Sequence, residues 1–388
     1  QPADRVARNY AGGIGVNFGS TIDIDGDTFV IGGAREGVSN SYPDTGVYVF
    51  ENGAIAARLS STLGASNQGG LGDVAVVDDF VAFTTTHTVF DETTYNGAVH
   101  FFSKGAGWQN GTSNLFGTNH SWVAANGITL NEFGEGKLVG FQTPNAGAGA
   151  VEFALALPLA DLGSLTDVGN VSFFQVSPNG GNPSASLRAN FWGSEANQQA
   201  GYFITAADDT VFFGHHYGSS LNNTVHFGGS GYALNTMSVG VASAYDMAAA
   251  ASGSLTSGDL TLALRTGSVF NIFELESQAG SLAITEAGVF RSPTFADFVK
   301  DIAYSGDTLL VGAPSANNSG GGALFFREPA AGWGSLTSSG ATYTPELVIN
   351  GSGSYQPAGY ESFNGRLGHA VALDGDTALL GMPTWHGG

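Results

Sequence analysis

The chain has 388 residues and a formal net charge of −21, from 33 acidic and 12 basic side chains. So large an acidic excess repels phosphate backbones, which argues against nucleic-acid binding. There is no Cys, which excludes disulfides, thiol catalysis and thiolate metal sites.

Glycine and apolar residues indicate the class of fold. The 59 glycines follow no collagen-like period, and 42% of the residues are hydrophobic. This combination suits many short strands joined by tight turns. No apolar run reaches the roughly 18 residues that a membrane-spanning helix needs, so we expect no such span. The chain begins at Gln1 without a charged leader and an apolar stretch, so we expect a processed, secreted or cell-surface protein.

A short hairpin motif recurs along the chain. Its first copy, "GSTIDIDGDTFVIGG", joins an alternating strand to a second apolar strand through a tight Asp-Gly turn, and the aromatic-rich "GVYVF" follows. A further segment, such as 54–61 or 344–351, usually separates one third strand from the next copy. The turns stand near positions 26, 78, 136, 208, 258, 306 and 375, and the copies from 136 to 258 are the least regular.

The spacing of these turns predicts the architecture. Separations of roughly 50 to 70 residues are the size of a four-stranded propeller blade. We therefore predict an all-β, seven-bladed β-propeller that forms a single domain over 1–388. Short helices are expected, if anywhere, at the Ala-rich 244–252 and at 292–300. The expected blades cover 18–62, 71–115, 122–170, 200–235, 240–288, 295–351, and 366–388 together with 4–12.

The last blade poses a question of closure. We expect the N-terminal strand, Arg5 to Tyr10, to be its outer strand. A gap would then remain where the third strand of the other blades lies. Unpaired strand edges invite an extended segment, so we expect either a continuation of the chain or a neighbouring subunit to supply that strand.

Two segments resemble a known family. "NFGSTIDIDGDTFVIGG" and "RLGHAVALDGDTALLGMP" resemble FG-GAP repeats, the blades of integrin-α-type propellers and of many secreted bacterial proteins. Phe18-Gly19 matches the first half of the motif and Gly312-Ala313-Pro314 the second. The resemblance implies a propeller. In calcium-binding members the first turn is a longer, Asp-rich loop, whereas here it is the short "DGDT" or "SGDT", so we expect no metal and no cofactor.

No pattern of catalytic residues stands out. Glu274 and Glu276 share one strand face, a spacing that is common on solvated strands. Adjacent His215 and His216 could chelate a metal only from a loop, because neighbours in a strand point to opposite faces. No serine-hydrolase elbow, phosphate-binding loop or dinucleotide fingerprint is present. We expect no catalytic residue, and a protein that is not an enzyme.

Loops at one end of a propeller form its usual working surface. The most variable ones join second to third strands, at 34–45, 84–96, 215–223 and 314–321. We interpret the protein as an adhesion or assembly module that binds a protein through this face. The alternatives are binding of a surface glycan by the same aromatic rings, and a propeller hydrolase or lyase. The candidate binding residues are Tyr42, Tyr95, His215, His216, Tyr217 and Trp385.

The short turns generate a test with calcium. A Ca²⁺ ion needs six to eight oxygen ligands, which a two-residue turn cannot supply. We expect the same melting temperature with excess calcium and with a chelator. A fall of several degrees on chelation would contradict this, because metal that binds the folded chain adds its binding free energy to stability.

Overall fold

A computed structural model describes most strands and turns of the chain. The described residues are 18–36, 44–60, 71–91, 94–106, 108, 136–142, 149–162, 164–178, 183–215, 224–228, 234–238, 247–254, 260–266, 268–278, 281–292, 299–316, 320–351 and 366–383. They form β-strands and two short 3₁₀ turns, η1 (Lys104–Ala106) and η4 (Trp333–Ser335). No helix within this part of the chain is long and apolar enough to cross a membrane.

The first three sheets come from the N-terminal half. The first holds β1 (Thr21–Asp25), β2 (Thr28–Glu36), β3 (Asp44–Glu51) and β4 (Ala54–Ser60). The second holds β5 (Leu71–Val77), β6 (Phe80–Asp91) and β7 (Thr94–Ser103). The third holds β8 (Lys137–Phe141), β9 (Val151–Leu157), β10 (Asn170–Ser177) and β11 (Ser184–Trp192).

The other four sheets come from the rest of the chain. The fourth holds β12 (Phe203–Ala207), β13 (Thr210–Gly214), β14 (Thr224–Gly228) and β15 (Leu234–Ser238). The fifth holds β16 (Met247–Ser252), β17 (Leu260–Thr266), β18 (Val269–Gln278), β19 (Ser281–Arg291) and β23 (Thr337–Thr342). The sixth holds β20 (Asp301–Ser305), β21 (Thr308–Gly312), β22 (Gly322–Arg327) and β24 (Leu347–Asn350), and the last holds β25 (Val371–Asp374) and β26 (Thr377–Leu380).

Tight turns join the first two strands of most sheets. In the first sheet Asp25 pairs with Thr28, so the turn has two residues. Gly26 there has a φ of 57°. At the same place, Gly306 of the sixth sheet has a φ of 57° and Gly375 of the last sheet a φ of 50°. Positive φ is the conformation that two-residue hairpin turns require and that glycine adopts without strain. The recurring Gly-Asp-Thr of the sequence is therefore a hairpin signal.

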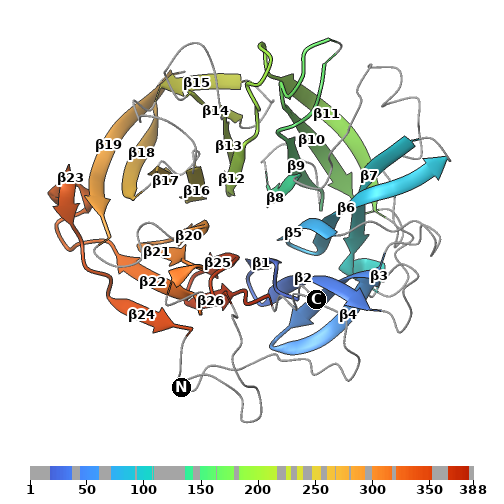
Figure 1. The fold of residues 1–388 in the computed structure, drawn as a ribbon, viewed down its shortest axis with the longest axis horizontal. Helices are drawn as coiled ribbons and strands as arrows, with labels where there is room; N and C mark the ends of the chain where they lie inside the picture. The colour runs from blue at the N-terminus through green and yellow to red at the C-terminus, as the bar shows by residue number, and fades with distance from the viewer. Residues whose placement is uncertain are drawn as a thin grey trace.

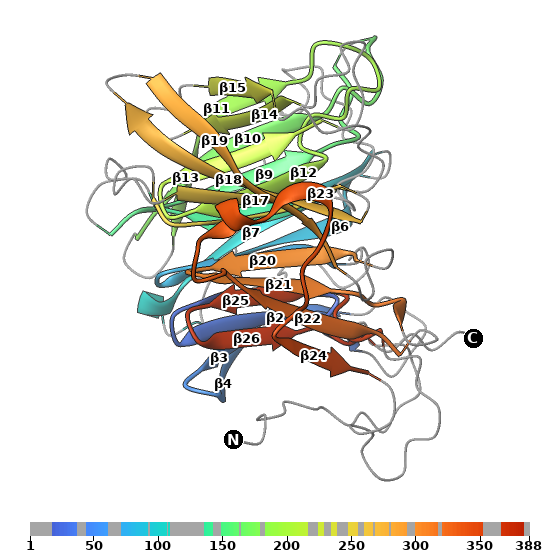
Figure 2. The same cartoon turned by 90° about the vertical axis from the view of Figure 1, so that its left-hand side faces the viewer.

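The sheets stand in a ring around a central channel (Figure 1). One strand of each sheet lines the channel, and each of these innermost strands contacts the next around the ring. β25 contacts β1, which closes the ring. Seen from the side, the strands run roughly along the channel (Figure 2). The chain is thus an all-β propeller, as the sequence predicted. The innermost strands are β1, β5, β8, β12, β16, β20 and β25.

Two sheets differ from the strand assignment made from sequence. The turn predicted near position 136 makes the following "KLVGF" a second strand, but as β8 this segment is innermost, and the third sheet extends to Trp192 rather than ending at 170. Its hairpin was misread because Phe141 pairs with Glu152 across a long loop instead of a tight turn. In the fifth sheet the Ala-rich segment is the innermost strand β16, not a helix. Ala favours helices in isolation, but here tertiary packing overrides that propensity.

Five of the seven sheets have the four or more strands of a complete blade, and the other two are described with three and two strands. The last of these is the β25–β26 hairpin, at the place where the sequence predicted an incomplete blade. Arg5 to Tyr10, the expected outer strand of that blade, lies outside the described residues.

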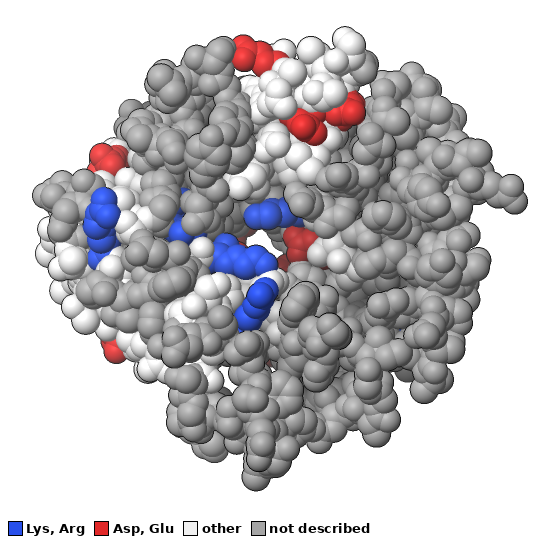
Figure 3. All heavy atoms as spheres, in the orientation of Figure 1, with Lys and Arg blue, Asp and Glu red and all other residues white. Residues whose placement is uncertain are grey.

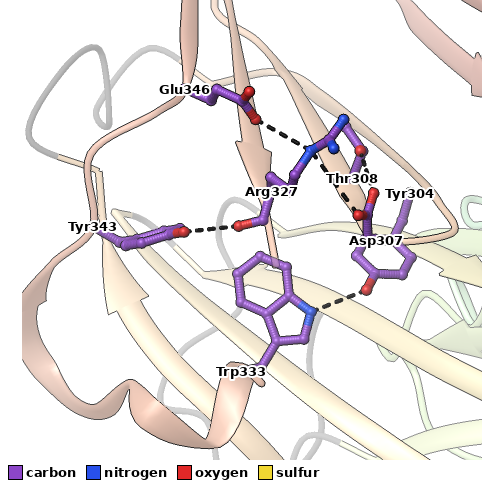
Figure 4. A network of polar contacts seen from close by, with 7 residues as sticks. All are labelled: Tyr304, Asp307, Thr308, Arg327, Trp333, Tyr343 and Glu346. Atoms are coloured by element: carbon purple, nitrogen blue, oxygen red, sulfur yellow. Dashed lines mark hydrogen bonds and ion pairs between the residues drawn. The ribbon is translucent and has the colours of Figure 1, made fainter. Parts of the chain in front are cut away.

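One strand that follows the sixth sheet in the chain pairs with the fifth sheet. β23 follows the third strand of the sixth sheet, yet it pairs in parallel with β19 of the fifth. Just before it, Trp333 of η4 is 1% exposed and stacks on Phe290 of β19, with ring centroids 5.6 Å apart. Its indole N–H donates to the hydroxyl of Tyr304 of β20 at 3.0 Å (Figure 4). One side chain therefore joins two neighbouring blades.

A salt bridge lies at the outer side of this junction. Arg327, at the end of β22, lies 3.2 Å from Glu346 and 3.9 Å from Asp307, while its carbonyl accepts the hydroxyl of Tyr343 at 2.8 Å (Figure 4). All three charged side chains are more than half exposed, so the pairs contribute little on their own. The buried Trp333 is the main stabilising group of the junction.

Replacing Trp333 tests this. We expect Trp333→Ala to lower the free energy of unfolding by about 3–5 kcal/mol, because it leaves a large cavity between two blades. Trp333→Phe keeps an aromatic ring on Phe290 and loses the hydrogen bond to Tyr304, so we expect a loss of about 1–2 kcal/mol. Urea denaturation measures both. Equal losses for the two variants would contradict a role in packing.

Candidate functional site

The central channel has a volume of about 1230 Å³ and two chemically different ends. At one end, which we call the turn end, lie the tight hairpin turns after the innermost strands, with aspartates such as Asp78, Asp208 and Asp374. At the other, which we call the basic end, the innermost strands begin. The second strand of each blade runs back toward the basic end, as the pairing of Thr21 with Gly32 shows. Connections from second to third strands therefore leave at the basic end.

Side chains at the turn end link several blades to their neighbours. In a two-residue hairpin the N–H of the first turn residue has no partner within its own ladder. Asp374, the last residue of β25, accepts the Gly26 N–H at 2.7 Å and so joins the last blade to the first. The same link runs from Gly375 to Ser305 at 3.0 Å, from Gly306 to Ser252 at 3.0 Å, and from Asp78 to Asp25.

A second set of links lies near the basic end. Asp301 accepts the backbone N–H of Val371 at 2.9 Å, and Asp73 accepts that of Leu138 at 2.9 Å. The hydroxyl of Thr21 donates to the other carboxylate oxygen of Asp73. Hydrogen bonds to charged groups contribute about 1.5–3 kcal/mol each. These aspartates are thus structural acceptors between blades, and sequence reasoning missed them.

The channel raises the pKa of three of its carboxyl groups. Desolvation in the channel wall is the main cause for Asp23, Asp73 and Asp301. For Asp23 the pKa rises to about 7, although the Val76 N–H, at 2.8 Å, favours the charged form. Repulsion from Asp73 and Asp25 adds to the rise. Negative charge inside the channel is therefore costly.

Basic side chains gather at the opposite end of the innermost strands. Lys137 begins β8, Lys300 directly precedes β20, and Arg366 lies three residues before His369 at the approach to β25. Figure 3 shows Lys and Arg atoms around the central opening, with acidic atoms at its wall. Lys137, Lys300 and Arg366 are exposed, and His369 is half-buried. Sequence reasoning missed these cations, because the segment that begins at Lys137 was assigned as a second strand and Arg366 stands five residues before β25.

His369 holds Lys300 in place. Its Nδ1 lies 3.3 Å from the carbonyl oxygen of Ser20, so this nitrogen donates, and Nε2 accepts from the Lys300 ammonium. Desolvation, followed by the positive charges of Lys300 and Arg366, lowers the pKa of His369 to about 4. The ring is therefore neutral at pH 7 and serves as an acceptor rather than as a further cation.

The residues predicted for binding are only partly described. His215 directly follows β13, whose last residue Gly214 pairs with Phe203 at the start of β12, so His215 lies at the basic end. Tyr95 lies in β7 and pairs with Val89, because β6 and β7 extend as a hairpin through what was expected to be a loop. The remaining candidates, Tyr42, His216, Tyr217 and Trp385, lie outside the described residues.

The described residues include no group of three or more side chains that could hold a metal ion. His100, in β7, is fully buried and stacks on Phe83 with ring centroids 4.7 Å apart. Desolvation lowers the pKa of His100 to about 3.

The candidate functional site is the channel with its basic end.

Comparison with known proteins concerns the fold. No family model and no curated protein matches the chain. The solved propeller of Dos1 is similar over 95% of this chain and 79% of its own, with a TM-score of 0.45 and 8% identity. Sqt1 of Chaetomium thermophilum, solved bound to the N-terminus of the ribosomal protein L10, is similar over 92% and 77%, with a TM-score of 0.42 and 12% identity. The ring of sheets in the structure supports the propeller that the FG-GAP resemblance implies, whereas the family is not shown.

The prediction that the chain is not an enzyme requires correction. A post-proline cleaving enzyme from Rickettsia typhi is similar over 79% of this chain, with a TM-score of 0.39 and 8% identity. The chain spans 42% of that enzyme's length. The expectation that the chain is not an enzyme is withdrawn, because a propeller fold does not determine whether a protein has an activity.

The raised pKa of Asp23 gives a pH-dependent prediction. Its folded-state pKa of about 7 exceeds the ordinary 3.8, so the folded state binds more protons between these values and loses stability as pH rises through them. Asp23→Asn keeps an oxygen to accept the Val76 N–H and removes the charge. We expect this variant to match the wild type near pH 4 and to have a higher melting temperature at pH 8.

Asp27→Asn is the matched control, because Asp27 lies at the same hairpin and is exposed. It should leave the melting temperature unchanged at both pH values. An Asp23→Asn effect that is equal at pH 4 and pH 8 would contradict the raised pKa of Asp23.

Proposed function

We propose that the chain is a secreted or cell-surface propeller of seven FG-GAP-like blades that acts as an adhesion or assembly module and binds a protein at the basic end of its channel. The observation that carries the proposal is the gathering of Lys137, Lys300 and Arg366 where the second strands end. Loops that leave a rigid scaffold at one end are a common place for recognition. The propeller fold itself commonly serves protein interaction.

Rigidity supports this proposal. The side-chain links from Asp73 to Leu138 and from Asp301 to Val371 hold the starts of β8, β20 and β25 in fixed positions around the opening. A preorganised surface loses little conformational entropy on binding, which favours affinity. Seven blades are supported by the seven innermost strands, of which each contacts two neighbours.

A photo-crosslinking experiment tests which face binds. Tyr202 lines the channel at its basic end and is half-buried, whereas Asp376 is exposed at the turn end. Each is replaced in turn by p-benzoylphenylalanine, and the folded protein is irradiated on the surface of its source cells. We expect a protein adduct from the Tyr202 variant and none from the Asp376 variant.

The alternatives give different results. An adduct from Asp376 alone, or equally from both positions, overturns the proposed face. An adduct that disappears after enzymatic removal of glycans assigns the contact to a surface glycan instead of a protein.

A further inference from the structure

Three cations at the basic end have no ion-pair partner among the described residues. Lys137, Lys300 and Arg366 are a quarter of the 12 basic side chains in a chain with 33 acidic ones. Two basic side chains elsewhere form printed contacts with carboxylates, Lys104 with Glu51 at 2.9 Å and Arg327 with Glu346 at 3.2 Å. With acidic groups in nearly threefold excess, chance alone would favour pairing. Within the part of the chain that the structure describes, three cations therefore converge at this end of the channel without an ion pair to a carboxylate.

The nearest carboxylates are already committed to the fold. Asp73 accepts from Thr21 and from the N–H groups of Leu138 and Val74. Asp301 accepts the Val371 N–H at 2.9 Å and the Ile302 N–H at 3.1 Å. Both lie in the channel wall between the blades that they join. They attract Lys137 at longer range, but their acceptor oxygens face backbone donors.

The cations also repel one another. The charges of Lys137 and Arg366 contribute, after desolvation, to the lowered pKa of Lys300. His369 fixes Lys300 through a hydrogen bond and so prevents the ammonium from turning away into solvent. Like charges held together in a partly desolvated site are stabilised by an incoming anion, because Coulomb attraction is stronger there than in bulk water.

The rest of the molecule selects where an anion binds. The turn end carries aspartates at its hairpins, including Asp25, Asp78 and Asp374. An anion approaching that end is repelled, whereas one approaching the basic end meets Lys137 and Lys300 in the wall of an open cavity, with the charge of Arg366 acting on Lys300. The charge distribution therefore favours anion binding at the basic end of the channel over the turn end.

We propose that the basic end of the channel binds carboxylate groups, presented either by an Asp- or Glu-rich peptide segment or by a small polycarboxylate. Lys137, Lys300 and Arg366 are the binding residues, and His369 positions Lys300. The proposal deepens the proposed function, on which it rests for the protein partner, by naming the chemistry that the basic end recognises.

Titration calorimetry with three probes tests this proposal. The probes are N-acetylated hexaglutamate, hexaglutamine as its uncharged counterpart, and citrate. Salt is kept at about 0.1 M, where a Debye length of about 10 Å screens the distant acidic surface but not groups in contact. We expect hexaglutamate to bind the folded chain and hexaglutamine not to bind.

Single substitutions locate the site. We expect Lys137→Met and Lys300→Met each to weaken hexaglutamate binding about tenfold, which corresponds to about 1.4 kcal/mol. Lys104→Met is the matched control, because Lys104 is a half-exposed cation in η1, outside the basic end. It should leave affinity unchanged. Melting temperatures of the three variants show that each is folded before it is titrated.

Each outcome decides a point. Citrate binding with the same dependence on the two lysines, without hexaglutamate binding, keeps the carboxylate site and assigns it to a small ligand. Binding of hexaglutamine as tight as that of hexaglutamate, an equal loss in Lys104→Met, or no binding of any probe overturns the proposal. A protein adduct at Tyr202 without carboxylate binding would retain the proposed function and refute this inference alone.

Discussion

Most neighbouring blades of this ring are linked by a side-chain acceptor on one innermost strand that binds a backbone N–H of the next. Within a blade, backbone hydrogen bonds pair neighbouring strands. The innermost strands of neighbouring blades belong to different sheets and are not paired in this way. Asp374 to Gly26 closes the ring at the turn end and joins residues 348 positions apart, and the contact of His369 with the Ser20 carbonyl joins the same two blades at the basic end. Ser252 and Ser305 make the same link elsewhere. An aspartate or serine immediately before the turn therefore has a structural reason.

The same links determine the electrostatics of the channel. Carboxylates that bridge blades must face the channel wall, where desolvation raises the pKa of Asp23, Asp73 and Asp301. Because the oxygens of Asp73 and Asp301 accept backbone N–H groups, these carboxylates attract the lysines at the basic end without forming an ion pair with them among the described residues. Stability of the ring and availability of cations for a ligand thus come from one arrangement. It follows that Asp73 and Asp301 affect binding through the positions of the strands.

Chain topology explains where recognition residues can be. Second strands return to the start of the innermost strands, so His215 and the cations of β8 and β20 meet at one end although they are far apart in sequence. β23 pairs with β19 of the fifth sheet, and Trp333, just before β23, stacks on Phe290 of that sheet. Adjacent blades are therefore also joined at their outer side. The ring is therefore stabilised at the channel and at its periphery.

The repeated Gly-Asp-Thr turns and alternating strands were sufficient to predict an all-β propeller, because two-residue hairpins depend on local backbone conformation. The Ala-rich β16 and the long-looped β8 could not be assigned in this way, since packing against neighbouring blades decides their place. The candidate aromatic residues were chosen by loop position, whereas the cationic end was missed. Lys137 and Lys300 are 163 positions apart in the sequence, and only closure of the ring brings their charges to one opening. The sequence alone determined the local hairpins and the acidic balance of the chain, and the tertiary structure decided which charges share the channel, because Coulomb interactions depend on distance in space and not on separation along the chain.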